Sequence, residues 1–529
     1  MNQQGVRPIY ETISPALRAL LTFVVMTGAF MAILDTTIVD VVIPKMMAPL
    51  ATDLYGIQWV ITAYMTAAAV GLLLIESLAR VWGLKRLFLT GLATFTVSSA
   101  LCGQAGSLPE MIVSRVVQGL GEAFIMASAQ TILLSIYPPE RRGLAMGIFS
   151  LGVSFAPALG PTLGGWLTEH LSWRWVFYVN LPVGSLNFLA GLALLPSALG
   201  RRGGFQFNFI SYFFLAGFTV SLLILLSKGQ QLGWFQADLI VYLGFGAAVL
   251  LILYLISELL SPRPLIDFYI FTLKEYGLSM GFYFFVLGFS MYQIFYLLPL
   301  YYEGLKQLTT FQTGLHMLAF AVFIGMFSPI SGLLSDKIGP EKVLSLCLAL
   351  YLFTAYFLVP SLNYYTPATR AALLTIPFGI SLGTFFAPLT TLALRNLGEK
   401  TSLGVSLMHY LRFVGGSFGT AIATNTLKHR WALHYDEISA LQNTTYLARF
   451  IEEGSQRLRA FFPETLATKK AKALMYHVQG LQSLSHAFQD TFRHSFYFAL
   501  LGSAFLVTLI ILKAKEGPPV SRRPRQVGS

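Results

Sequence analysis

Charged side chains interrupt apolar segments of this chain that are otherwise long enough to cross a lipid bilayer. Asp35 and Asp40 lie in the segment LDTTIVDVVIP, and Arg115 and Glu122 lie in RVVQGLGEA. An ionisable group near the bilayer centre costs several kcal/mol unless it faces a wet cavity or a partner. Desolvation favours the neutral form of a carboxyl group, which can then hold and release a proton near physiological pH. These residues are therefore candidates for proton exchange within the membrane.

Each of these residues has a functional and a structural interpretation. We expect Asp35, about twenty residues into its apolar segment, to face an aqueous central cavity and to exchange protons there. The structural alternative is a hydrogen bond from Asp35 to a neighbouring helix. Asp40 is predicted to be a solvated residue or a hydrogen-bond partner at the outer rim of the cavity, and the alternative is a direct role in proton coupling. On this interpretation, Asp35→Asn abolishes coupled transport and leaves folding largely intact.

Arg115 and Glu122 are seven residues apart and share one face of a predicted helix, about 10 Å from each other. That separation is too large for a direct pair, but both side chains could line one cavity. Arg115 is either a residue that tunes the carboxylates or a structural residue bonded to carbonyls. Glu122 is either a second titrating group, a counter-charge for cationic substrates, or a structural partner of Arg115.

The second half of the chain supplies further polar and aromatic candidates. His316 could titrate near neutral pH and contact substrate, or it could be a packing residue. Tyr292 and Phe295 belong to an aromatic run that could stack on a flat lipophilic substrate, although aromatic residues near helix ends also form interfacial belts. Arg412, which precedes two glycines, is predicted to act in gating, in a structural or an anion-facing role.

The composition is that of an integral membrane protein. Hydrophobic residues make up 55% of the 529 residues, and only 11% are charged, against roughly a quarter in an ordinary soluble domain. The net charge of +12 comes from short turns between apolar segments, so nucleic acid is not expected as a partner. Cys102 and Cys347 give no disulfide framework and no metal spacing. The chain also lacks a phosphate-binding Gly-Lys-Ser/Thr loop and a Gly-x-Ser-x-Gly elbow, so it is not predicted to be an ATP-driven pump or an enzyme, and no cofactor is expected.

Fourteen apolar segments long enough to span the membrane are separated by charged or Gly/Pro-rich turns. Lys and Arg are concentrated in the turns on the same side as the N-terminus, so the positive-inside rule places both termini in the cytoplasm. The predicted spans are residues 15–46, 53–77, 84–104, 107–137, 142–169, 173–197, 207–227, 236–260, 277–302, 311–335, 342–361, 368–394, 402–427 and 493–513.

An internal repeat relates the two halves of the chain. The turn ESLARVWGLKRLF begins at Glu76, and GLLSDKIGPEKVL begins 256 residues later. Repeated halves around a central site are typical of secondary transporters. We therefore predict an N-terminal six-helix bundle (1–200), two linking helices (201–262) and a C-terminal six-helix bundle (263–529). The last of these contains a polar external loop (428–492), which is either a solvated helical hairpin or a docking site for a partner protein.

Two groups of residues are predicted to act in gating. Glu76, Arg80 and Asp336 lie in the repeated turns, where a carboxylate could form a latch between helices that breaks and re-forms as the halves rock. Small residues permit close helix packing, and proline removes a backbone hydrogen bond, so a helix rich in both can bend or seal against the other half. The fifth predicted helix has this composition, with Gly152, Pro157, Gly160, Pro161 and Gly164.

Several motifs together resemble one transporter family. SLGVSFAPALGPTLGGWL resembles the fifth-helix motif of major facilitator superfamily exporters, and RVVQGLGEA resembles their fourth-helix arginine motif. With LDTTIVDVVIP, WRWVFYVNLPVG and KGQQLGW, they are similar to the fourteen-helix drug:proton antiporter subfamily, the EmrB/QacA type. The resemblance implies a proton-coupled exporter of amphipathic or lipophilic molecules in the cytoplasmic (inner) membrane, in which Arg115 tunes proton exchange. It also implies contact with membrane lipids and a periplasmic adaptor protein as a partner.

The chain departs from the family pattern at four positions. Glu76 and Arg80 replace the Gly and the Asp of the first repeated turn, Asp40 replaces an Asn, and Glu122 replaces a small residue. These departures keep two alternatives open. One is a dedicated exporter of a single metabolite, such as a siderophore or a fatty acid. The other is a membrane scaffold that does not transport and engages an envelope partner through residues 428–492.

Overall fold

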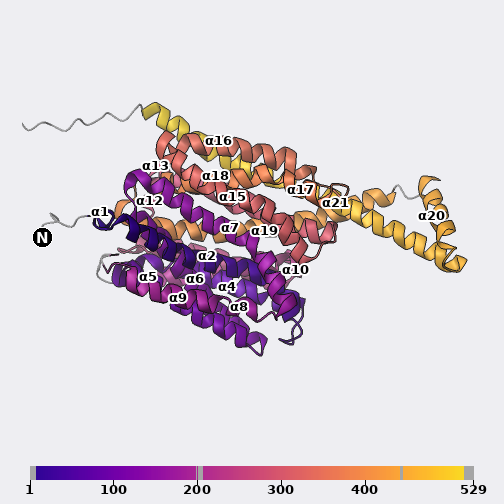
Figure 1. Ribbon diagram of the computed structural model, residues 1–529, viewed down its shortest axis with the longest axis horizontal. Helices are drawn as coiled ribbons and strands as arrows, with labels where there is room; N and C mark the ends of the chain where they lie inside the picture. The colour runs from indigo at the N-terminus through magenta and orange to yellow at the C-terminus, as the bar shows by residue number, and fades with distance from the viewer. Residues whose placement is uncertain (1–7, 198, 200–206, 441–444, 517–529) are drawn as a thin grey trace, which may run out of the picture.

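The computed structural model describes residues 8–197, 199, 207–440 and 445–516. All the regular structure in these ranges is helical (Figure 1). Eleven of the described helices are long and apolar enough to cross a membrane, and one shorter apolar helix accompanies them. The predicted all-helical membrane fold is therefore confirmed. Helices lie at all fourteen predicted positions, although those at 53–77, 142–169 and 402–427 are not among the eleven.

Six spans form the N-terminal part of the molecule. Within it α5 packs on α6, α4 packs on α6, and α2 packs on α7 and α9. The short helices α1 (Ile9–Thr12), α3 (Leu54–Ile57) and α8 (Trp175–Tyr178) precede three of its spans. The spans themselves are α2 (Pro15–Met46), α4 (Trp59–Leu72), α5 (Ile75–Gln104), α6 (Leu108–Ile136), α7 (Arg142–His170) and α9 (Asn180–Leu194).

Two linking helices, α10 (Phe209–Leu232) and α11 (Asp238–Leu260), pack on each other. The first of them also contacts both halves of the molecule. Its Ser227 hydroxyl lies 2.7 Å from that of Thr62 on α4, and α10 also packs on α19 of the C-terminal half. The predicted domain boundaries at residues 200 and 262 are not tested by these contacts and stay a prediction.

The C-terminal part contains six further spans, three of which include irregular turns. In its first span the π-helical segment η3 (Tyr283–Ser290) joins two α-helices, and a second π-helical segment, η4 (Tyr301–Leu305), ends the span. The helices are α12 (Tyr269–Thr272), α13 (Lys274–Phe282), α14 (Met291–Leu300), α15 (Thr310–Ile338), α16 (Pro340–Phe353), α17 (Ala368–Leu374), α18 (Ile376–Leu394), α19 (Thr401–Ala440), α20 (Thr445–Leu458) and α21 (Glu464–Glu516).

Local sequence signals set several helix ends. Ser14 caps α2 by accepting a hydrogen bond from the backbone of Leu17. Thr309 and Gln312 form a capping box at the start of α15. Such side chains satisfy backbone N–H groups that have no partner in the first turn of a helix.

The internal repeat read from the sequence has a structural counterpart in two glycines. Gly83 (φ 76°, ψ 159°) and Gly339 (φ 94°, ψ 142°) are 256 residues apart and have the same unusual backbone conformation. A positive φ is strained for residues with a side chain, and glycine adopts it freely. Gly339 separates α15 from α16, and Gly83 makes a sharp kink within α5, after which the chain continues as a helix, so both repeated turns are tight.

The two halves contact each other along α7 and α15, which run antiparallel. Gly143 and Gly332 lie at one end of this contact, and Thr162 and Gly314 lie near the other. A Cβ atom built on Gly332 would come within 2.2 Å of the Gly143 carbonyl oxygen, so the backbones touch where side chains are absent. Small residues at such positions permit this close approach.

The polar segment at residues 428–492 is largely helical and extends the last two spans. Its α19 part and its α21 part project together from one end of the molecule and carry α20 (Figure 1). With 53 residues, α21 is about 80 Å long, more than twice the thickness of a hydrocarbon core. The predicted last span, 493–513, is thus the second part of a longer helix. The helix α1 and the C-terminal end of α21 lie at the opposite end of the molecule (Figure 1).

Candidate functional site: a buried ion pair and a second acid between the halves

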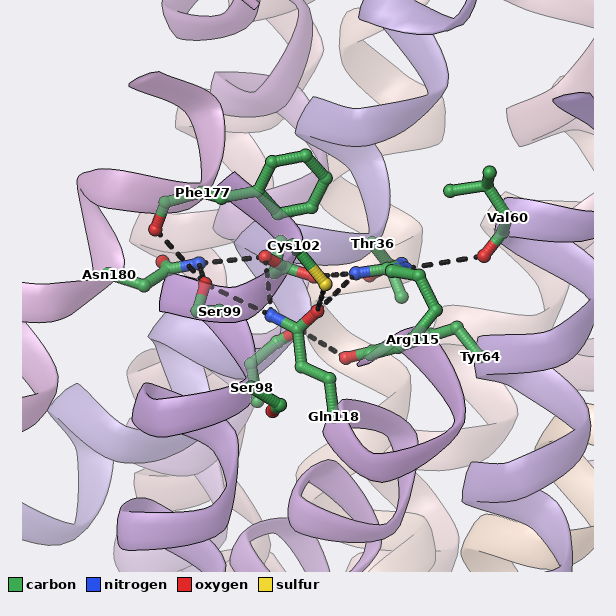
Figure 2. A network of polar contacts seen from close by, with 12 residues as sticks. Thr36, Val60, Tyr64, Ser98, Ser99, Cys102, Arg115, Gln118, Phe177 and Asn180 are labelled. Atoms are coloured by element: carbon green, nitrogen blue, oxygen red, sulfur yellow. Dashed lines mark hydrogen bonds and ion pairs between the residues drawn. The ribbon is translucent and has the colours of Figure 1, made fainter. Parts of the chain in front are cut away.

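The carboxylate of Asp35 accepts hydrogen bonds from a polar network inside the N-terminal half. Arg115, Gln118 and Asn180, which donate them, are drawn in Figure 2. Oδ2 of Asp35 accepts a hydrogen bond of 2.5 Å from Nη1 of Arg115. Its Oδ1 accepts hydrogen bonds from Nε2 of Gln118 at 3.0 Å and from Nδ2 of Asn180 at 2.7 Å. Because the three donors come from α6 and α9, Asp35 on α2 ties three helices together.

Arg115 is also fixed on its other sides. Its Nε donates to the carbonyl oxygen of Val60 at 3.2 Å, and its Nη1 also donates to Oε1 of Gln118 at 2.7 Å. The guanidinium group lies 3.8 Å from the centre of the Tyr64 ring, which allows a cation–π interaction. Arg115 therefore contacts both a carboxylate and a backbone carbonyl, and its role in tuning proton exchange stays a prediction.

A second layer of polar groups completes the network. The Ser99 hydroxyl accepts hydrogen bonds from Gln118 and Asn180 and donates to the backbone carbonyl of Phe177. The Cys102 thiol donates to Gln118 at 3.4 Å. Cys102 is therefore part of the network.

The environment of Asp35 differs from the expected one. Its side chain is fully buried, and that of Arg115 is 1% exposed, so Asp35 does not line an open aqueous cavity in this conformation. The charge is tolerated because an opposite charge and two amide groups surround it. Breaking a buried pair by removing one partner is strongly destabilising, so the structure predicts that Asp35→Asn lowers stability, in contrast to the expectation from sequence that folding stays largely intact.

Glu122 occupies a different position, where α6 faces the C-terminal half. Its carboxyl group lies against the hydroxyl of Tyr64 and within electrostatic range of Arg412 on α19. Tyr64 thus lies between the two charged sites, with its ring against Arg115 and its hydroxyl against Glu122. Among the described residues, Glu122 forms no ion pair with Arg115 or with any other cation within 4.0 Å, and its Oε2 is buried without a hydrogen-bond partner.

The two carboxylates of the repeated turns each reach a helix of the opposite half. Asp336 on α15 accepts hydrogen bonds from the backbone N–H groups of Gly143 (2.8 Å) and Leu144 (2.9 Å) at the start of α7. Glu76 pairs with Arg80 at 2.9 Å and lies beside the backbone of Leu403 at the start of α19. Both acids therefore interact favourably with unpaired N–H groups and with the positive end of a helix dipole.

The glycines of α7 differ in how tightly they are packed. A Cβ atom on Gly160 would lie 2.3 Å from Oγ1 and 2.8 Å from Cβ of Thr37 on α2. A Cβ atom on Gly152 would meet only the flexible end of Met26. Pro161 and Gly164 are buried in the same helix, which is continuous over its 29 residues.

The remaining predicted residues lie apart from Asp35. Tyr292 packs over Gly416, one turn from Arg412. Phe295 packs against Phe320, with ring centres 5.6 Å apart. His316 lies in the first turns of α15, where its Nδ1 contacts the Gln312 carbonyl oxygen and its ring packs against Tyr302. The backbones of Asp40 in α2 and Pro157 in α7 are helical, but their side chains lie outside the described part of the structure.

Comparison with known proteins accounts for this architecture. A family model described as Major Facilitator Superfamily matches residues 25–420. The chain belongs to this family. It is 31% identical to the multidrug export protein EmrB of Haemophilus influenzae over 79% of this chain and 82% of that protein. It is 29% identical to the fatty acid resistance protein FarB of Neisseria gonorrhoeae, over 80% and 84% of the two chains.

A solved major facilitator structure shows the same fold. The human organic anion transporter MFSD10 (TETRAN) superimposes with a TM-score of 0.56 at 12% identity, covering 92% of this chain and all of that one. The resemblance to EmrB-type major facilitator proteins is therefore confirmed. The protein is a multi-pass membrane transporter of small molecules and not an enzyme.

Sequence reasoning missed three partners of the ion pair, Ser99, Gln118 and Asn180. Two of these residues belong to motifs that the sequence analysis had already singled out: Gln118 lies in RVVQGLGEA and Asn180 lies in WRWVFYVNLPVG. Gln118 is also three residues from Arg115, the spacing that places two side chains on one helix face. A polar amide inside an apolar span was the signal, although only the fold shows that both amides reach Asp35.

Proposed function

We propose that this protein is a proton-coupled exporter of amphipathic or lipophilic small molecules across the cytoplasmic membrane, working by alternating access. The observation that carries the proposal is the buried Asp35–Arg115 pair. Asp35 can change its charge by taking up a proton, whereas Arg115 stays charged at all relevant pH values. The pair therefore has two electrostatic states, and a single proton switches between them.

Protonation of Asp35 changes what holds the N-terminal half together. The neutral acid no longer compensates Arg115, whose guanidinium lies on the ring of Tyr64. Tyr64 in turn contacts Glu122 at the boundary between the halves. This contiguous set of side chains connects the proton site with the surface where a substrate would lie. Linkage requires that proton and substrate weaken each other's binding by the same free energy.

The carboxylates of the repeated turns supply the gate in this scheme. Glu76 and Asp336 hold the starts of α19 and α7, and both contacts lie at the end of the molecule that carries the repeated turns. We assign this end to the cytoplasm, with both termini on that side. Opening toward the cytoplasm then requires both carboxylates to release the helix ends that they cap.

The projecting hairpin of α19 and α21 lies on the opposite, external side in this assignment. A periplasmic adaptor protein is the partner proposed for it, and membrane lipids surround the spans. The names of two relatives, a multidrug export protein and a fatty acid resistance protein, support export of amphipathic molecules. The second name also favours a narrower alternative, a dedicated exporter of fatty acids.

The test is proton movement in proteoliposomes that contain the purified full chain, with an imposed pH gradient. Lipophilic cations and fatty acids are added separately, and proton flux is followed with a pH-sensitive dye. We expect substrate-triggered flux that is lost in the neutral double variant Asp35→Asn/Arg115→Gln. Asp267→Asn is the matched control, because it makes the same chemical change in a half-exposed pair with Lys400 and should retain flux.

The outcomes separate the proposed functions. Flux triggered by many unrelated amphipaths supports a multidrug exporter, and flux triggered by fatty acids alone supports the dedicated exporter. Absence of flux from folded protein for every compound would refute proton-coupled export and favour a scaffold that does not transport.

A further inference from the structure

A cluster of buried polar atoms without protein partners lies where the two halves meet. It contains Oε2 of Glu122, Nε of Arg412 and both ring nitrogens of His409. All three side chains are more than nine-tenths buried. Buried polar groups in native proteins are nearly always hydrogen-bonded, and those that are not call for an explanation such as a bound molecule.

These residues face one another from opposite halves of the molecule. Glu122 is on α6, whereas His409 and Arg412 are one turn apart on α19, and α19 packs against α4 and α6. Arg412 is the cation with the strongest favourable effect on Glu122, yet the described structure contains no ion pair within 4.0 Å between the two. The other groups near Arg412 are the phenols of Tyr283 and Tyr292. Glu122 and Arg412 thus lie on opposite sides of the interface, and each has a polar side-chain atom without a hydrogen-bond partner.

Aromatic side chains from both halves adjoin this cluster. The ring of Phe149 on α7 lies 6.3 Å from that of His409, in an edge-on arrangement. Phe149 also stacks on Phe386 of α18, with ring centres 5.8 Å apart. Ligand sites in proteins commonly combine such apolar walls with a few polar groups that fix orientation.

We propose that Glu122, Arg412 and His409 form a binding site for zwitterionic amphipathic molecules. The acidic group of the ligand binds Arg412 and His409, its cationic nitrogen binds Glu122, and its apolar body packs on Phe149 and Phe386. This inference rests on the proposed export function and names the substrate class for it. A dipolar ligand satisfies both charged side chains at once, which a simple cation or a simple anion does not.

The same arrangement gives a reason for exchange of proton against substrate. A proton on Glu122 removes the charge that holds the ligand nitrogen, so proton and ligand compete for one group. The other charged or titratable side chains that act on Glu122 are Tyr64, Asp35, Arg115 and Arg412. Arg115 is already paired with Asp35, so Glu122 is the carboxylate available to a ligand at the interface.

The first experiment uses three fluorescent compounds with the same aromatic body and the purified full-length wild-type protein. Nα-dansyl-lysine is a zwitterion, its methyl ester keeps only the ammonium group, and its Nε-acetyl derivative keeps only the carboxylate. We expect the zwitterion to bind at least about tenfold more tightly than either relative, since each charge-assisted hydrogen bond contributes a comparable factor. Its affinity should fall as the pH is lowered, because a proton on Glu122 removes the charge that holds the ammonium group.

Variants assign the two ends of the ligand. Glu122→Gln should weaken binding of the zwitterion and the ester and leave the acetylated compound unchanged, and it should remove the pH dependence. Arg412→Gln should weaken the zwitterion and the acetylated compound only, and Arg412→Lys should restore part of the preference. The comparison of the three compounds on wild-type protein needs no variant, so it holds even where a variant fails to fold.

Two outcomes would overturn the inference. One is binding of either singly charged compound as tightly as the zwitterion, which would make this a site for cations or for anions. The other is no binding of the zwitterion to protein that still exchanges protons for other compounds in proteoliposomes. In that second case the proposed export function stands while the site assignment falls, whereas absence of all substrate-triggered proton flux would remove the export function itself.

Discussion

The Asp35–Arg115 pair makes an asymmetric prediction about stability. Replacing Asp35 by Asn leaves the buried, permanently charged Arg115 without its counter-charge, which typically destabilises a protein by about 3–5 kcal/mol. Replacing Arg115 by Gln leaves a carboxyl group that becomes neutral by binding a proton, so the loss should be smaller. The double variant Asp35→Asn/Arg115→Gln has no buried charge at this position and should recover at least half of the loss caused by Asp35→Asn.

The double-mutant cycle is measured by equilibrium unfolding of the purified variants in mixed micelles, followed by tryptophan fluorescence. A loss of about 3 kcal/mol changes the unfolding equilibrium constant roughly 150-fold. Asp267→Asn serves as the control, since its half-exposed ion pair contributes at most about 1 kcal/mol.

Two results would refute this reasoning. If Asp35→Asn is as stable as the wild-type protein, the Asp35–Arg115 pair does not hold the N-terminal half together. If the double variant is as unstable as Asp35→Asn alone, the loss comes from the hydrogen bonds to the amides and not from an uncompensated charge.

Three further predictions concern the gate, the packing and a surface pair. Glu76→Gln weakens the cap on α19 and should increase labelling of cysteines introduced at the cytoplasmic ends of the helices; unchanged labelling would exclude a latch. Gly160→Ala places a methyl group against Thr37 and should lower the unfolding temperature and the transport rate, whereas the same change at Gly152 should have little effect on either. The hydrogen bond from Lys400 lowers the pKa of Asp267. The small stabilisation by this pair, measured against Asp267→Asn, should therefore be constant from pH 8 to pH 5 and disappear only below about pH 4. A loss of stabilisation between pH 7 and pH 5 would contradict that assignment.

The chain composition and pattern were enough to predict the fold. Apolar segments of about twenty residues can satisfy their backbone only as helices in lipid, so a helical membrane fold followed directly from their recurrence along the chain. The repeat also followed from sequence, because Gly83 and Gly339 have a positive φ that only glycine adopts without strain. Asp35, Arg115 and Glu122 were recognised as unusual for the same reason, since charges are costly in a membrane wherever the helices pack.

What the sequence left open was which of these charges meet. Asp35 and Asn180 are 145 residues apart, and Asp35 and Arg115 are 80 apart, so their contacts depend on how α2, α6 and α9 pack. Periodicity places a side chain on a face of its own helix but does not say which other helix covers that face. Only the tertiary structure could therefore separate the enclosed pair of Asp35 and Arg115 from Glu122, which faces Arg412 across the interface between the halves.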